Sequence, residues 1–175
     1  MNFRKQLALK PQDVVVALKV ALAGDVVPSF AQLARGLHMS VSEVHSAAQR
    51  AAMSRLLEAS PALRANKAAL HEFLLHGVMY AFPYVEGPVT RGLPTGVSAA
   101  PLREHFDHGH TLPLVWPDAE GEARGPSICP LYPTVPAACR DDPALYQALA
   151  TLDAIRGGAA RERELAAQLL TRLLL

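Results

Sequence analysis

The fold is decided by the stretch Leu33-Ala34-Arg35-Gly36-Leu37-His38-Met39-Ser40-Val41-Ser42-Glu43-Val44. Two short helices that cross closely need a small residue where they touch, and Ala34 stands at that place. Ser40 and Glu43 have the spacing of a capping box, which predicts that a helix begins directly after Ser40. The stretch therefore predicts two helices joined by a tight turn.

Apolar residues at helical spacing extend both helices. Ser29 is a natural N-cap for a helix over 30–37, and the second helix is expected to run from Val41 to about Arg55. Its buried side should hold Val44, Ala47, Ala48 and Ala51. The opposite side of the second helix is then free to face a partner.

The segments on either side complete a small domain. A helix is predicted from Pro11 to Ala23, with Gly24 just past its end. Leu56-Leu57-Glu58 and Leu63-Arg64-Ala65 read as two short strands around a turn at Ser60-Pro61. Asn66 can cap a further apolar helix that reaches Tyr80, before Pro83 stops it.

This order of elements, and the motif quoted above, resemble the winged helix-turn-helix domains of bacterial transcriptional regulators, the MarR-like group included. The resemblance covers about residues 10–67. His38 departs from it, because such sequences usually place Gly there, at a position that can require positive φ. The resemblance implies a mainly α fold with a short β-wing that binds double-stranded DNA. A three-helix module that binds protein is the alternative.

If the helix from Val41 is the recognition helix, its exposed face supplies the contacts to bases, and Arg50 flanks that face. Gln49 can pair with adenine, and Val41 could touch a thymine methyl group. Basic residues nearby would face the phosphates. The expected DNA-binding residues are Ser40, Val41, Ser42, His45, Ser46, Gln49, Arg50, Arg35, Arg55, Arg64 and Lys67, with Lys10 also toward the backbone.

Charge is unevenly distributed along the chain. Residues 1–67 hold nine Lys or Arg against four Asp or Glu, whereas residues 68–175 hold eight Arg against twelve acids. A basic head on a mildly acidic body suits a protein whose head alone must meet a polyanion. We therefore expect a DNA-binding domain over 1–82 and a second unit over 83–175.

The second unit changes character at Pro83. Prolines and scattered glycines from Pro83 to Asp142 predict ordered loops and short strands, and helices are expected over 143–156 and 160–174. These terminal helices, with the helix that follows Asn66, are expected to form a homodimer. The tail from Asp142 to Leu174 more faintly resembles regulators found beside nucleotidyltransferase-type toxins. That resemblance implies an antitoxin and autorepressor that holds a toxin through its C-terminal half.

Several other classes of protein are not expected. Cys129 and Cys139 are too few for a disulfide framework, and no signal-peptide core or membrane span is present, so a cytoplasmic protein is predicted. The cluster His105, His108 and His110, with the two cysteines, matches no usual zinc spacing. No common catalytic motif occurs. Neither an enzyme nor a metal or cofactor is therefore expected.

Overall fold

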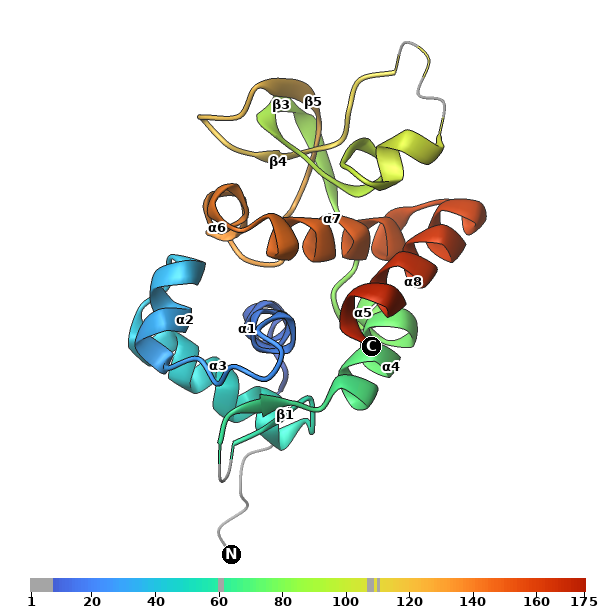
Figure 1. Ribbon diagram of the computed structural model, residues 1–175. Coiled ribbons are helices and arrows are strands. Elements are labelled where there is room, and N and C mark those ends of the chain that lie inside the picture. Colours follow the sequence, from blue (N-terminus) through green and yellow to red (C-terminus); the bar gives the residue numbers. More distant parts are fainter. Residues whose placement is uncertain (1–7, 60–61, 107–108, 110) are drawn as a thin grey trace, which may run out of the picture.

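The computed structural model describes residues 8–59, 62–106, 109 and 111–175 (Figure 1). The chain is mainly helical with small sheets, as expected from the sequence. The helices of the described part are α1 (Pro11–Leu22), α2 (Phe30–Leu37), α3 (Val41–Met53), α4 (Lys67–His76), α5 (Val78–Ala81), α6 (Val135–Asp141), α7 (Pro143–Gly157) and α8 (Ala160–Leu174). The strands are β1 (Leu57–Glu58), β2 (Arg64–Ala65), β3 (Glu86–Pro94), β4 (Val115–Pro117) and β5 (Ala123–Ile128), with 3₁₀ turns at Gly96–Ser98 and Leu102–His105.

The N-terminal elements, which we call the head (residues 8–82), follow the predicted order. Three helices precede a two-stranded antiparallel hairpin in which Leu57 pairs with Ala65 and Glu58 with Arg64. The long helix expected after Asn66 is instead broken at Gly77 into α4 and α5. A Cβ at that glycine would lie 2.8 Å from the ring of Phe73, so the break is tightly packed.

The segment from Pro83 to Asp142 contains strands and one helix. β3 pairs antiparallel with β5 from Glu86 to Gly92, and then with β4 from Gly92 to Pro94. The sheet curls so tightly that a Cβ at Gly121 would stand 2.2 Å from the backbone of Gly92. Short strands were expected here, but α6 was not.

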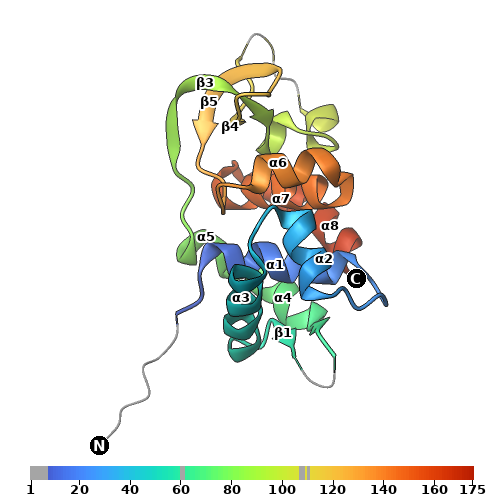
Figure 2. The same cartoon turned by 90° about the vertical axis from the view of Figure 1, so that its left-hand side faces the viewer.

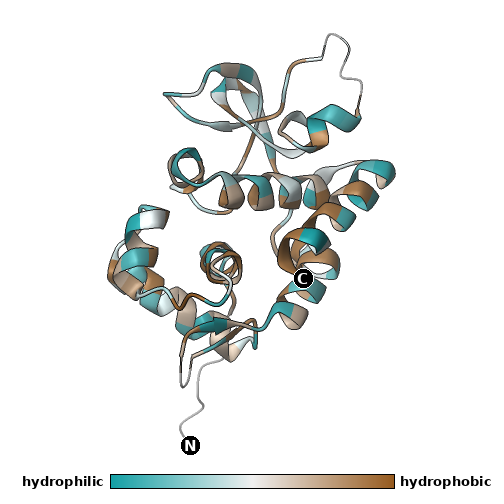
Figure 3. Cartoon of the chain, viewed as in Figure 1, coloured by the Kyte–Doolittle hydropathy of each residue, from teal (hydrophilic) through white to brown (hydrophobic). Residues whose placement is uncertain are grey.

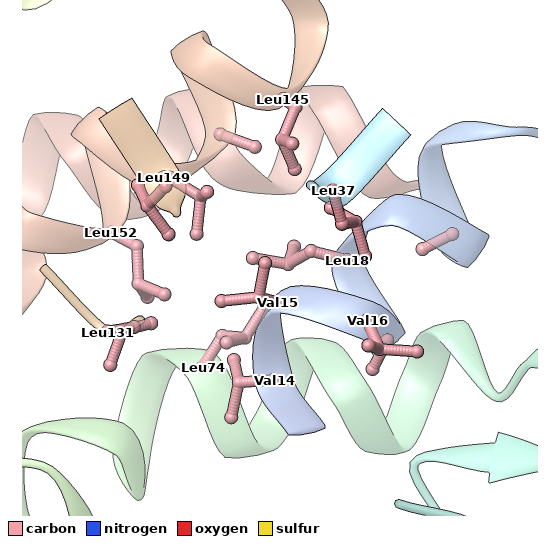
Figure 4. Packing of buried hydrophobic residues seen from close by; sticks show 14 of the residues in the cluster. Val14, Val15, Val16, Leu18, Leu37, Leu74, Leu131, Leu145, Leu149 and Leu152 are labelled. Carbon is pink, nitrogen blue, oxygen red and sulfur yellow. The ribbon is translucent and has the colours of Figure 1, made fainter. Parts of the chain in front are cut away.

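The hydrophobic core is shared by the two halves of the chain. α1 lies at its centre, with Val14 to Leu18 at most 2% exposed, and contacts α3, α7 and α8. Figure 4 shows Val15 and Leu18 among leucines of α7, and Figure 3 shows the apolar ribbon of α1 enclosed by other helices. The units expected over 1–82 and 83–175 therefore pack into one continuous core.

A buried polar cluster holds the sheet on α7. The Asp153 carboxylate accepts hydrogen bonds from Thr95 Oγ1 at 2.9 Å and from Trp116 Nε1 at 2.6 Å, and it pairs with Arg156 at 2.6 Å. The Arg156 guanidinium also donates to the carbonyls of Phe82 and Pro83. Each buried charge of this cluster has partners. The network joins β4, the residue that follows β3 and the end of the head to α7.

No helix in the described part of the chain combines the length and apolar character needed to cross a membrane.

Candidate nucleic-acid interface

α3 presents two distinct sides. Val44, Ala47, Ala48 and Ala51 are buried, as predicted, and they face α1 and α2. Successive residues of a helix are about 100° apart, so Ser42, Ser46, Gln49 and Met53 lie on the opposite side. Ser42 and Gln49 are exposed, Ser46 is half-buried, and Met53 is 63% exposed. In Figure 2, α3 crosses the front of the molecule.

The first turn of α3 is fixed by a reciprocal cap. Ser40 Oγ accepts the Glu43 amide at 3.2 Å, and Glu43 Oε2 accepts the Ser40 amide at 2.8 Å. The hydrogen bond from the Ser40 side chain, joined by one from Tyr132, lowers the pKa of Glu43 to about 2. Glu43 therefore carries a negative charge at the N-terminal end of α3, the end that was predicted to face DNA.

His45 and Val41 flank the exposed side of α3. The His45 ring meets the Phe30 ring edge-on, with centroids 5.1 Å apart, so its orientation is constrained by the first residue of α2. Val41 is 51% exposed. Both side chains thus lie at the surface, where the sequence placed them.

Exposed basic side chains lie on several elements of the head. Arg35 on α2, Arg55 after α3, Arg64 on β2 and Lys67 at the start of α4 are exposed, as is Lys10. None of these five forms an ion pair with another residue in the part of the chain that the structure describes. Their charges are therefore available to an external anion.

Arg50, which was predicted to contact DNA, forms an ion pair inside the head. Its Nε and Nη2 atoms donate to the two oxygens of the Asp13 carboxylate at 2.8 and 2.6 Å, and its side chain is only 13% exposed. Asp13 is fully buried and also accepts the amide of Lys10. This bidentate pair ties α3 to the start of α1, so Arg50 belongs to the packing of the head and not to the phosphate contacts.

The turn between α2 and α3 has the geometry that the sequence indicated. His38 has φ 54° and ψ 39°, the left-handed conformation that Gly adopts most readily. The Met39 amide bonds to the Ala34 carbonyl at 3.0 Å, as in a Schellman motif. Arg55 also has a positive φ, of 61°, and ends α3 in the same way, with the Leu56 amide bonded to the Ala51 carbonyl.

Residues before and within α6 contact this turn, which sequence reasoning missed. Thr134 Oγ1 donates to the Leu37 carbonyl at 2.7 Å, and Tyr132 Oη donates to Glu43 Oε1 at 2.6 Å. His38 Nε2 lies 3.1 Å from Asp141 Oδ2. Lys19 of α1 pairs with Asp142. We call residues 131–142 the clasp; Figure 2 shows α6 above α2.

The cluster of histidines and the two cysteines are only partly described by the structure. His105 and Cys129 are exposed and Cys139 is buried, where desolvation raises the pKa of its thiol. His108 and His110 lie outside the described residues. Among the residues that are described, no three His, Cys, Asp or Glu side chains are placed to hold a metal ion.

No family model, curated protein or solved structure matches this chain.

Proposed function

We propose that this protein is a sequence-specific, double-stranded DNA-binding regulator of bacterial transcription that acts in the cytoplasm without enzymatic activity. One observation carries the proposal: Ser42, Ser46 and Gln49 share one side of α3, and exposed cations with no ion pair among the described residues lie on the elements next to it. A protruding helix with neutral hydrogen-bonding side chains suits the major groove, where base edges are read. The flanking cations suit the phosphates.

Each exposed side chain of α3 has a chemical counterpart in the groove. Gln49 offers a donor and an acceptor for adenine, while Ser42 and Ser46 offer hydroxyl groups. The Ser40 hydroxyl is already bonded to Glu43 and belongs to the cap of α3. Val41 and Met53 add apolar contact for a thymine methyl group. The reading surface proposed here therefore centres on Ser42, Ser46 and Gln49.

The hairpin β1–β2 acts as the wing in this proposal. It follows α3 directly and carries Arg64, while Lys67 begins the next helix. Arg55 stands between α3 and the hairpin. These three cations, on the segment from the end of α3 to the start of α4, would supply the phosphate contacts.

We propose a homodimer because one reading helix contacts too few bases for specific binding, and two-fold symmetry supplies two half-sites. The dimer contact expected on α4, α7 and α8 has less apolar surface available than the sequence suggested. Leu70, Leu74, Leu170 and Leu174 are buried within one chain, where α4 packs on α8. The side chains left for a partner copy near these helices include Tyr80 and Leu175, which are 77% and 69% exposed.

The test compares two glutamines. Sites would be selected from a random duplex pool with the wild-type protein, and affinities for the selected site and for random duplex would then be measured. Gln49→Ala should weaken binding to the selected site by about 1–3 kcal/mol, roughly 5- to 150-fold, because a bidentate base contact is lost. Gln168→Ala, at an exposed position of α8, is the matched control and should change nothing.

Two outcomes would count against this reading of α3. If Gln49→Ala and Gln168→Ala bind the selected site equally well, α3 does not read the bases. If the folded wild-type protein selects no sequence and binds no duplex, the head is a protein-interaction module.

A further inference from the structure

We propose that the clasp, residues 131–142, is a positioning element for the reading helix: Tyr132 and Thr134 hold the α2–α3 turn in the orientation that sequence-specific binding requires. This inference rests on the proposed DNA-binding function. It concerns two hydroxyl groups that lie about 90 or more residues away from their partners along the chain.

The helix pair α2–α3 has little apolar area of its own to hold it. α2 is eight residues long and buries Leu33, Ala34 and Leu37. α3 buries one valine and three alanines, and alanine removes far less apolar surface from water than a larger side chain does. The turn also has His38 in a left-handed conformation that is unfavourable for a residue other than Gly. α1 contacts both helices, and the turn between them gains further support from elsewhere in the chain.

The clasp supplies this support at both sides of the turn. Thr134 Oγ1 satisfies the Leu37 carbonyl, one of the groups left without a partner where α2 ends. Tyr132 Oη binds the carboxylate of Glu43, the residue that closes the capping box of α3. One segment thus holds the last residue of α2 and the first turn of α3.

The clasp is itself firmly held. Val135, Ala138 and Cys139 are at most 2% exposed, and α6 packs against α2 and α7. Asp142 begins α7 by accepting the Leu145 amide and also pairs with Lys19 of α1. Burial raises the pKa of Asp142, but hydrogen bonds from Lys19 and from backbone amides outweigh burial and lower it. The two hydroxyl groups therefore project from a fixed base.

The clasp does not cover the central reading residues. Its contacts reach Leu37, His38 and Glu43, whereas Ser42 and Gln49 remain exposed on another side of α3. It can thus orient the helix without occupying the groove-facing surface. A segment in this place tunes specificity more than general affinity, because phosphate contacts come from cations outside it.

The experiment uses the full chain with the double variant Tyr132→Phe/Thr134→Val, which removes only the two hydroxyl groups. Tyr146→Phe is the matched control, since Tyr146 Oη donates to the Pro94 carbonyl of β3 at 2.7 Å and not to the α2–α3 turn. Thr134→Ser keeps the hydroxyl and serves as the conservative variant. Affinity for the selected duplex and for random duplex would be measured together with thermal unfolding.

The double variant should lower the ratio of specific to non-specific affinity by about tenfold, the size of one misread base pair. Non-specific binding should stay within about twofold, and Tyr146→Phe and Thr134→Ser should keep the wild-type ratio. The amide of Val44, which bonds to the Ser40 carbonyl, should exchange with solvent faster in the double variant alone.

An unchanged ratio, or a ratio that rises, overturns the inference; a rise would make the clasp an inhibitor of reading. A ratio that falls equally in Tyr146→Phe would also overturn it, because the effect would then be one of general stability. If wild-type protein binds no duplex, the proposed function fails first, whereas wild-type binding with an unaffected double variant removes the clasp proposal alone.

Discussion

Arg50 and Arg55 are both basic residues at the C-terminal end of α3, and their surroundings differ. Arg50 lies against the buried carboxylate of Asp13, which has no other cationic partner among the described residues. Arg55 is exposed and adopts a left-handed backbone conformation. The first residue therefore acts on the stability of the head, and the second is free to act on a ligand.

Substituting the two arginines should separate these roles. Arg50→Ala should destabilise the protein by about 3–5 kcal/mol, the cost of leaving one member of a buried pair uncompensated. Arg55→Gly should leave stability unchanged or raise it by up to about 1 kcal/mol, because Gly adopts the left-handed conformation without strain. Chemical denaturation measures both, and duplex binding should weaken in Arg55→Gly.

The opposite ranking would contradict this assignment. If Arg50→Ala unfolds at the wild-type denaturant concentration, then the Asp13 pair contributes nothing to stability. The double variant Asp13→Asn/Arg50→Met is informative as well, since removal of both charges should recover part of the stability lost in Arg50→Ala.

The first turn of α3 is stabilised by a titratable cap. Glu43 is held ionised by the Ser40 hydroxyl and by Tyr132, with a pKa of about 2 against an ordinary value of 4.5. Because the pKa is depressed in the folded state, the stabilisation is fully present above about pH 4.5. It is lost as the pH falls from there through about 2. The cap of α2 lacks this pH dependence, because the Gln32 side chain that closes it does not titrate. Gln32 Oε1 accepts the Ser29 backbone amide, and Ser29 Oγ accepts the Gln32 backbone amide.

Two serine substitutions test this difference. Ser40→Ala and Ser29→Ala should each cost about 1 kcal/mol at pH 7, as is usual for the loss of an N-cap. The cost of Ser40→Ala should shrink as the pH falls from about 4.5 towards 2, because the stabilisation by the ionised Glu43 is lost over that range, whereas the cost of Ser29→Ala should stay constant. Unfolding curves at pH 7 and pH 3 measure both. Equal pH dependence of the two costs would show that Glu43 does not titrate as described.

Local patterns predicted the head better than the rest of the chain. Capping residues and apolar spacing located α1, α2, α3 and the hairpin, because each of these signals lies within a few positions of the element it forms. The positive φ of Arg55 had no such signal, since neither Gly nor Asn stands there. α6 was missed because a seven-residue helix between prolines has little propensity of its own, and its buried residues gain their stability from α2 and α7.

The contacts that assemble the molecule join residues far apart in sequence. Lys19 pairs with Asp142, Arg50 with Asp13, and Tyr132 with Glu43. Each pairing depends on tertiary packing, so no spacing in the sequence predicts it. These pairs also change the candidate interface, because they remove Lys19 and Arg50 from the cations that can meet a polyanion. The charge asymmetry and the exposed cations were predicted from the sequence, but the pairing of Arg50 with Asp13 was not.

After these pairings, five exposed cations of the described head remain without an ion pair: Lys10, Arg35, Arg55, Arg64 and Lys67. Each phosphate that a cation neutralises adds about −0.9 to the slope of log K against log salt concentration for duplex DNA. Three to five contacts per chain therefore predict a slope between about −3 and −5.

The most direct test is the salt dependence of duplex binding, measured by fluorescence anisotropy on one duplex of random sequence between about 50 and 200 mM salt. The triple variant Arg55→Gln/Arg64→Gln/Lys67→Gln should flatten the slope by up to about 2.7. Arg124→Gln/Arg161→Gln/Arg172→Gln removes the same charge from exposed positions outside the head and should keep the wild-type slope. Absence of binding at about 50 mM salt, or equal flattening by the two triple variants, would contradict a DNA-binding head.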